Sequence, residues 1–301
     1  MSDPIAVFDR AAVRAHRDRA AARLDEHDFL LREVAERLAD RLDDVRRAFP
    51  VALDLGCHSG AFADALAGRG GIERLVQADL SPAMLGRASG PRVAADEEML
   101  PFADTSFDLV ASVLSLHWVN DLPGALVQMR RALRPDGLFL AAMLGGDTLH
   151  ELRAAFAEAE VAEEGGLSPR ASPFADAAVA GELLQRAGFA LPVVDVDTIT
   201  VTYPDTLALM RELRGMGESN AVVERRKGFS RRATLAAAAA AYEARFADAD
   251  GRVPATFEIV YLTAWAPHES QQKALRPGSA KARLADALGA AEIPAGDKAR
   301  P

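Results

Sequence analysis

Short apolar runs along the chain are each followed by a turn and, in the first half of the sequence, by a stretch with helical periodicity. That order is typical of a parallel sheet built from strand-helix-strand units, and two alternating runs further on predict two more strands. We therefore expect an α/β fold with a seven-stranded, mostly parallel sheet flanked by helices. The predicted strands are Val51 to Leu55, Leu75 to Asp79, a third from Arg92, Phe107 to Ser112, a fifth after the turn at Pro135, Val193 to Tyr203, and Pro254 to Trp265.

The remaining periodic stretches predict helices before and after this core. In the second of them, Phe29, Val34 and Leu38 lie on one helical face. The N-terminal helices are expected either to form a lid over a ligand site or to pack plainly against the sheet. The predicted helices are Ala11 to Arg23, Phe29 to Phe49, Asp147 to Glu164, Phe174 to Ala187, Thr206 to Leu213, and Arg231 to Phe246.

These elements divide the chain into three parts. Residues 1–47 are the N-terminal helices, and residues 48–266 are expected to form one α/β domain with helical insertions after the fifth strand. Residues 267–301 are polar at first and then rich in Ala and Pro, which predicts a mobile C-terminal tail.

The turn after the first strand predicts a ligand site. It reads Asp-x-Gly-x-x-x-Gly, from Asp54 through Gly56 to Gly60, and an acid, Asp79, ends the second strand. Glycines let the backbone approach a ligand, and a carboxylate at the tip of the second strand can accept both hydroxyls of a ribose. A dinucleotide site has a G-x-G-x-x-G turn aimed at a pyrophosphate, which Asp54 would repel. The pattern favours a cationic nucleoside such as S-adenosylmethionine over a dinucleotide, and a plain tight turn is the alternative.

Composition limits the classes of function. The 301 residues carry a net charge of −9 and the pI is near 5.3, which argues against a nucleic-acid groove because no concentrated basic face is apparent. The arginines of the N-terminal helix, such as Arg10 and Arg17, are expected on a solvated face. The single Cys57 cannot form an internal disulfide and fits a reducing compartment; its place in the turn makes it a candidate nucleophile, although small residues suit that turn anyway. No targeting segment or membrane-spanning run is visible, so a cytoplasmic location is expected.

From about Ala48 to Met143 the chain resembles the class I S-adenosylmethionine-dependent methyltransferases. The resemblance rests on the first turn, the acids that end the second and third strands, and the Pro-Asp-Gly turn before the fifth strand. It implies that Asp79 holds the ribose, that Asp96 receives the adenine amino group, and that the first turn holds the methionine end. His58 replaces a glycine that is common in that turn, and is expected either to narrow the site or to point to solvent. The implied cofactor-binding residues are Asp54, Gly56, Cys57, Gly60, Asp79, Leu80, Asp96, Glu97, Ser112 and Leu114.

Segments outside this core resemble the complex I assembly factor 5 family. They are the opening Val7 to Arg10, Leu114 to Pro123, Gly145 to Arg153, Gly215 to Asn220, and Val253 to Ile259. That resemblance implies hydroxylation of an arginine on the quinone-proximal subunit of complex I (NADH:quinone oxidoreductase), with that subunit as partner and any attachment to the inner membrane through it. A weaker resemblance is to malonyl-carrier methyltransferases of biotin synthesis. A non-catalytic escort of complex I assembly is a third interpretation.

The candidate residues for the reaction lie in these segments. His117 follows the fourth strand and is the candidate general base if the acceptor carries a proton; a histidine packed beside Trp118 is the alternative. An arginine substrate would be gripped by carboxylates and an aromatic face, for which Glu218, Asp147 and Trp118 are candidates. Hydroxylation needs oxygen activation, and the sequence reveals no metal-ligand set, because His16 and Asp18 would point apart on a helix.

Overall fold

The computed structural model describes residues 6–174, 176–272, 279 and 282–291. The chain divides into two units, Met1–Pro267 and His268–Pro301. Much of the predicted mobile tail, namely residues 273–278, 280–281 and 292–301, lies outside the described residues. Within the second unit the structure has one short helix, α10 (Leu284–Leu288).

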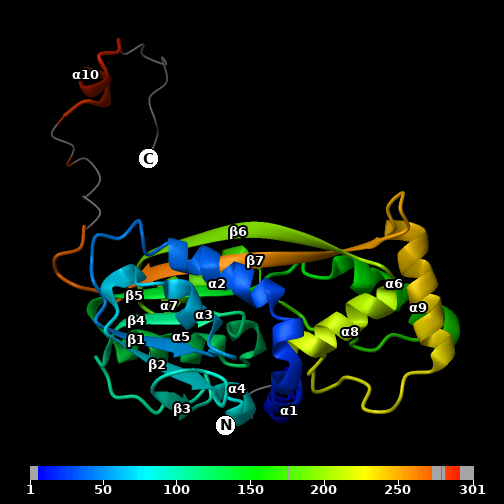
Figure 1. Ribbon diagram of the computed structural model, residues 1–301. Helices are drawn as coiled ribbons and strands as arrows, with labels where there is room; N and C mark the ends of the chain where they lie inside the picture. The colour runs from blue at the N-terminus through cyan, green and yellow to red at the C-terminus, as the bar shows by residue number, and fades with distance from the viewer. Residues whose placement is uncertain (1–5, 175, 273–278, 280–281, 292–301) are drawn as a thin grey trace, which may run out of the picture. The chain divides into compact units, whose positions relative to one another are not determined.

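The first unit is built on a single seven-stranded sheet with the order β3-β2-β1-β4-β5-β7-β6 (Figure 1). Neighbouring strands from β3 to β5 are parallel, whereas β7 runs antiparallel to both β5 and β6. The predicted α/β fold with a mostly parallel seven-stranded sheet is thereby confirmed. The strands are β1 (Val51–Leu55), β2 (Arg74–Asp79), β3 (Arg92–Ala94), β4 (Phe107–Val113), β5 (Leu133–Leu144), β6 (Ala190–Tyr203) and β7 (Val253–Trp265).

Helices cover both faces of the sheet because its central strands are apolar on both sides. Every residue of β4 is buried, as expected of a parallel strand between two helical layers. Residues of α2 and α3 pack on one face and residues of α5 and α7 on the other. The helices are α1 (Arg10–Ala20), α2 (Phe29–Asp40), α3 (Ala61–Leu66), α4 (Pro82–Leu85), α5 (Leu122–Ala132), α6 (His150–Glu164), α7 (Ala177–Arg186), α8 (Thr206–Met216) and α9 (Arg232–Phe246), with short 3-10 turns η1 (Ala21–Glu26), η2 (Arg69–Gly71) and η3 (Leu116–Trp118).

Two predicted boundaries were wrong. The helix expected from Phe29 to Phe49 ends at Asp40, although Leu42 and Phe49 remain buried. The apolar pattern therefore continued past the helix end, because a turn and an irregular segment feed the same core. The turn at Pro135 lies inside β5 rather than before it: Phe107 pairs with Leu133 and Leu109 with Leu138, so the turn is an irregularity in a longer strand.

The two long antiparallel strands extend the molecule past the parallel part of the sheet. Beyond the end of β5, the helices α6, α8 and α9 gather around the far ends of β6 and β7 (Figure 1). This helical group forms from the insertions predicted after the fifth strand. It creates a second environment next to the carboxyl ends of the parallel strands.

Candidate functional site

The first turn holds its glycines in conformations that other residues rarely adopt. Gly56 and Gly60 have φ angles of +69° and +97°. A Cβ atom on Gly56 would lie 2.1 Å from the Ser115 hydroxyl oxygen. The turn after β1 therefore presses directly against the loop after β4, and only glycine fits at position 56.

Asp79, at the end of β2, fixes the turn from the other side. Its carboxylate accepts hydrogen bonds from the backbone N–H groups of His58, at 3.0 Å, and Ser81, at 2.7 Å. Its exposed fraction is 0%. The predicted ribose acid thus lies beside the predicted methionine-binding turn, as parallel strands with adjacent carboxyl ends require.

Two arginines of α1 reach into this carboxylate cluster. The fully buried Arg17 places Nη1 3.3 Å from an Asp79 oxygen and 3.4 Å from Glu97 Oε1, and donates from Nη2 to Ser115 Oγ at 2.8 Å. Arg10 pairs with Asp96 at 2.7 Å and also with Glu97. The expectation that these arginines lie on a solvated face was wrong. We name Arg10, Arg17, Asp79, Asp96, Glu97 and Ser115 the carboxylate cradle.

The carboxylates and arginines of the cradle stabilise one another's charges because they lie close together. Burial alone would raise the pKa of Glu97, but Arg17, Arg10 and the Ser115 hydroxyl lower it to about 2. Burial likewise opposes the charge of Arg17, yet Asp79 and Glu97 raise its pKa above the ordinary value. Both groups are therefore ionised, which a buried pair requires if it is to stabilise the fold.

Asp54 is the exception, because it has no cation. Its carboxylate is fully buried in β1, and neither oxygen forms a hydrogen bond of good geometry; the neighbouring Gln77 amide is also without one. Burial raises the pKa of Asp54 to about 7, against the influence of Gln77. An orphaned carboxylate beside a glycine turn fits the ammonium group of an amino-acid-bearing nucleoside.

The other predicted cofactor residues lie around the same sheet edge. Cys57 is buried, and burial together with Asp54 raises its pKa above the ordinary value, so it is not an activated thiol. The Ser112 hydroxyl is buried without a hydrogen bond. Leu80 packs against a small cluster that includes Phe8 and Trp118. Leu114 has a positive φ of 47° and lines the neighbouring cavity.

His58 does not point to solvent. Its ring is 3% exposed and its Nε2 lies 3.2 Å from the carbonyl oxygen of Leu114, and it has a φ of +49°. Burial and the nearby Arg17 lower its pKa below the ordinary value, so the ring is neutral. It bridges the turn after β1 to the loop after β4.

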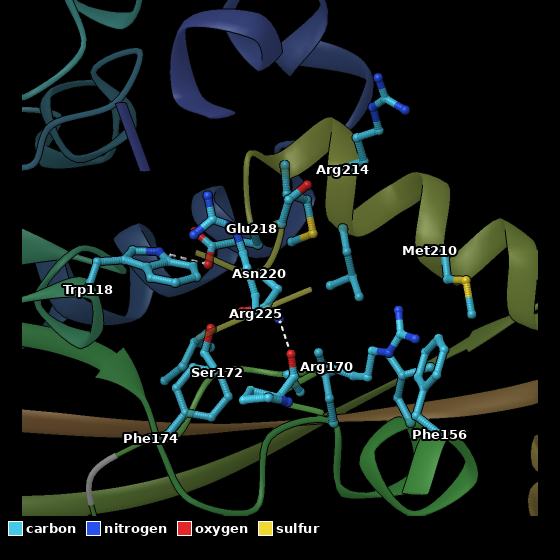
Figure 2. A pocket seen from close by; sticks show the side chains of 18 of the residues that line it. Trp118, Phe156, Arg170, Ser172, Phe174, Met210, Arg214, Glu218, Asn220 and Arg225 are labelled. Atoms are coloured by element: carbon cyan, nitrogen blue, oxygen red, sulfur yellow. Dashed lines mark hydrogen bonds between the residues drawn. The ribbon is translucent and has the colours of Figure 1, made fainter. Parts of the chain in front are cut away.

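A cavity of about 540 Å³ lies beyond the cradle, between the end of β5, α6, the loop before α7 and α8 (Figure 2). Its walls are mainly apolar side chains. Among the predicted site residues, Leu114, Trp118 and Glu218 line it, whereas the exposed Asp147 does not. The apolar walls come from Leu30, Leu144, Leu149, Leu152, Phe156, Phe174, Met210, Leu213, Met216 and Phe257.

Glu218 is held at one end of this cavity through a single oxygen. Its Oε2 accepts hydrogen bonds from Trp118 Nε1 and from the His117 ring, both at 3.0 Å. Burial would raise the pKa of Glu218, but His117 and Arg17 lower it, so the carboxylate is charged. Its Oε1 has no hydrogen bond from the described residues. The predicted His117, Trp118 and Glu218 therefore form one group, although His117 reaches the cavity only through Glu218.

Sequence reasoning missed the arginines of the site, namely Arg10 and Arg17 in the cradle and Arg170, Arg214, Arg225 and Arg226 along the cavity. Arg10 and Arg17 are seven residues apart, so they share one helical face, and that spacing was the available signal. Arg170 lines the cavity and donates to Glu160 and to Ser230 Oγ, while its Nη2 is buried without a hydrogen bond. No sequence signal marked Arg170, because it lies in a loop and its partners Glu160 and Ser230 are 10 and 60 positions away.

Metal-binding chemistry has no evident ligand set in the part of the chain that the structure describes. Within residues 6–174, 176–272, 279 and 282–291, no three His, Cys, Asp or Glu side chains gather as metal ligands do. His16 faces the Ser219 carbonyl oxygen and Asp18 accepts from Ser81 Oγ, so the two point to different neighbours. In the same ranges no helix has the length and apolar character to cross a membrane.

Comparison with known proteins places the fold. A family model described as a methyltransferase domain matches residues 53–141. A methyltransferase from Bacillus halodurans superimposes with a TM-score of 0.53 at 16% identity, covering 76% of this chain and 99% of that one. Phosphoethanolamine N-methyltransferase 2 from Haemonchus contortus gives 0.51 at 18% identity, covering 85% and 60%. The sheet order and these likenesses define a class I methyltransferase fold.

Relatives in sequence define the family more narrowly. Mitochondrial arginine-hydroxylase NDUFAF5 of Danio rerio is 46% identical over 287 residues, covering 93% of this chain and 89% of the relative. The Homo sapiens protein of that name is 47% identical over 281 residues, covering 91% and 81%. The chain belongs to the arginine-hydroxylase NDUFAF5 family, which confirms the resemblance to the complex I assembly factor 5 family. A malonyl-[acyl-carrier protein] O-methyltransferase of Halorhodospira halophila is 41% identical over 275 residues, covering 89% and 91%, so the weaker resemblance is also confirmed.

Proposed function

We propose that this protein hydroxylates an arginine side chain of a complex I subunit and binds S-adenosylmethionine at the carboxyl edge of its sheet. The observation that carries the proposal is Glu218, a charged carboxylate at one end of a mainly apolar cavity, with one oxygen held by His117 and Trp118. The cavity is also lined by Arg170, Arg214, Arg225 and Arg226. A carboxylate is the natural partner of a guanidinium group, and an aromatic face beside it adds stacking. The names of the relatives supply the reaction class, and the resemblance to the complex I assembly factor 5 family supplies the partner.

Each residue of the cavity group has a distinct part in this proposal. Glu218 pairs with the substrate guanidinium through its unused Oε1. His117 and Trp118 fix the Glu218 rotamer, so that little side-chain entropy is lost when the substrate enters. The apolar walls exclude water and strengthen the ion pair. His117 is then a positioning residue, and its predicted role as a direct general base applies only if an acceptor proton lies within its reach.

The cofactor residues follow the pattern that the family resemblance implies. Asp54 would hold the cofactor ammonium, Asp79 and Glu97 the ribose, and Asp96 the adenine, with Gly56 and Gly60 allowing close approach. When bound, S-adenosylmethionine supplies an activated methyl group and a sulfonium charge. Because Arg10 and Arg17 pair with the same carboxylates, these arginines must shift when a ribose enters. Hydroxylation by molecular oxygen places one oxygen atom on the arginine and the other in water, so it also consumes two electrons and two protons, which an external reductant supplies.

A mass measurement on the partner tests this function. The purified protein is incubated with the quinone-proximal complex I subunit and cell extract as the source of reductant, and an arginine of the subunit is expected to gain the mass of one oxygen. Glu218→Gln is expected to lower kcat/KM about 10- to 100-fold, the usual worth of a charge-assisted hydrogen bond. Glu224→Gln, an exposed acid of the same segment, is the matched control. Equal turnover by both variants would remove Glu218 from the substrate site.

Malonyl-carrier methylation is the second candidate, and Arg170 favours it. Arg170 lines the cavity and its Nη2 forms no hydrogen bond, but Glu164 Oε1 lies 3.7 Å from it, so a substrate carboxylate would compete with Glu164 for this nitrogen. Transfer of an isotope-labelled methyl group to a malonyl thioester of acyl carrier protein, lost in Arg170→Gln but kept in Glu218→Gln, would select this function. Absence of both products with normal binding of the complex I subunit would leave the escort role.

A further inference from the structure

The loop between α8 and α9 combines basic side chains with an exposed aromatic ring. Phe229 is 101% exposed, so its ring packs against no part of the protein that the structure describes. Lys227, Arg231 and Arg232 are also exposed and form no ion pair or side-chain hydrogen bond among the described residues. In Figure 1 this loop is the yellow segment between α8 and α9. We name residues 223–232 the basic loop.

The base of the basic loop is fixed to the body of the protein. Backbone hydrogen bonds join Val223 to Val7 at 2.9 Å and Asp9 to Ala221 at 2.8 Å. Arg225 pairs with Asp9 at 3.1 Å, and Arg226 pairs with Glu164. These contacts use Arg225 and Arg226 and leave Lys227, Arg231 and Arg232 without an ion pair among the described residues. Arg231 and Arg232 lie at the start of α9, and Ser230 before them accepts a hydrogen bond from Arg170. The exposed side chains of the loop are therefore presented to solvent from a defined position.

The charge of the loop contrasts with that of the chain. Five of the eight residues from 225 to 232 are Lys or Arg and none is acidic, whereas the whole chain has a net charge of −9. The expectation that the sequence contains no concentrated basic face missed this segment. An exposed apolar ring has an unfavourable contact with water. Glu224 is the one acid of the basic loop, and it pairs with none of the three free cations.

We propose that the basic loop docks the protein reversibly on an anionic lipid surface. Phe229 enters the interfacial layer, and Lys227, Arg231 and Arg232 lie among the headgroups. Basic side chains are attracted to anionic leaflets, and an aromatic ring gains from leaving water at the interface. The contact is direct, and so differs from attachment through a protein partner.

A lipid surface suits this loop better than a nucleic acid or an acidic protein. A single projecting ring is convex, and a lipid interface receives it without a complementary socket. A nucleic-acid track needs cations spread along a groove and several stacking rings. The free cations here number three and lie on both sides of one ring.

Docking through this loop orients the cavity. Arg225, Arg226 and Ser230 belong to the loop and also line the cavity (Figure 2 labels Arg225). A loop that lies on a bilayer therefore holds this side of the cavity close to the lipid surface. A protein substrate that assembles at a membrane would then meet the cavity without a long diffusional search. The docking itself does not depend on which reaction the cavity performs.

Vesicle sedimentation tests the proposal on the full-length protein. The wild type is expected to sediment with vesicles of phosphatidylglycerol and phosphatidylcholine but not with pure phosphatidylcholine, and high salt should release it. The triple variant Lys227→Gln, Arg231→Gln, Arg232→Gln is expected to bind about a hundredfold more weakly, since each cation near an anionic leaflet contributes roughly fivefold. Phe229→Ser should cost about tenfold.

Three exposed arginines elsewhere provide a matched control. Arg46→Gln, Arg74→Gln and Arg186→Gln remove the same charge from residues without ion pairs, and this variant should sediment like the wild type or better. Because every altered side chain is exposed, circular dichroism should show the same fold in all variants. Equal binding of wild type and loop triple variant, equal binding to both vesicle types, or loop-dependent binding to transfer RNA or polyglutamate without vesicle binding would each overturn the proposal.

Discussion

The carboxylate cradle and the cavity next to it lie along one edge of the sheet but are filled in opposite ways. In the cradle, Arg17 is buried between Asp79 and Glu97, and Ser115 touches Gly56, so charge meets countercharge at close range. The cavity has about 540 Å³ of space and mainly apolar walls, with Glu218 at one end. Side chains of the protein thus satisfy the charges of the cradle when no cofactor is bound, whereas the cavity contains no side chain that fills it.

This difference indicates which region needs all of its side chains for stability and which has room for a substrate. Buried charges cost free energy unless every partner is present, so the cradle stabilises the fold only as a complete set. Apolar side chains that face an empty space lose packing contacts, which destabilises the fold. Such a space is usual in a ligand-binding site and rare in a hydrophobic core. The cradle should therefore react strongly to the loss of a side chain, and the cavity should tolerate an added one.

Loss of Arg17 is the largest expected effect. Arg17→Ala would leave Asp79 buried without a cation and Glu97 with Arg10 alone, and should lower the free energy of unfolding by about 3–5 kcal/mol. Arg14→Ala on the same helix, whose side chain is 54% exposed and pairs weakly with Asp18, should change it by less than about 1 kcal/mol. Urea denaturation measures both. Equal losses of unfolding free energy in the two variants would show that the buried ion pairs of Arg17 contribute no more stability than the exposed pair of Arg14.

The second-largest expected difference between the two regions is their response to an added side chain. Gly56→Ala places a Cβ 2.1 Å from the Ser115 oxygen at a φ of +69°, and should destabilise the protein by about 2–3 kcal/mol. Ala171→Leu extends into the cavity that Ala171 lines, and should change the unfolding free energy by less than about 1 kcal/mol while lowering substrate turnover. Thermal unfolding and the hydroxylation assay report these two effects. A large loss of stability in Ala171→Leu would mean that the cavity is closed in solution.

The smallest expected effect is on cofactor affinity, and it comes from the protonation of Asp54. Its folded pKa is about 7, and an ammonium ligand pairs with the ionised form, so binding below pH 7 must first remove a proton. The affinity for S-adenosylhomocysteine should therefore be constant above pH 7 and fall about tenfold for each pH unit below it. Calorimetry at pH 6 and pH 8 measures the change. In Asp54→Asn the affinity should be lower and nearly independent of pH; an unchanged pH profile would exclude Asp54 as the titrating group.

Much of the fold was predictable because its signals are local. Strand β1, the glycines of the turn and Asp79 occur within 30 residues, and the apolar run of β4 indicates burial on both faces without knowledge of its neighbours. The end of α2 was not predictable, because Leu42 and Phe49 extend its apolar pattern although the backbone has already turned.

By itself the sequence determined which segments form the strands of a mostly parallel sheet and which acids end those strands, since periodicity and turn chemistry act over a few residues. Only the tertiary structure decided what those acids contact. Arg17 meets Asp79 across 62 positions and His117 meets Glu218 across 101, and nothing in either segment names its partner. The physical reason is that a buried charge is stabilised by whichever opposite charge the packing brings near, and packing is a property of the whole chain.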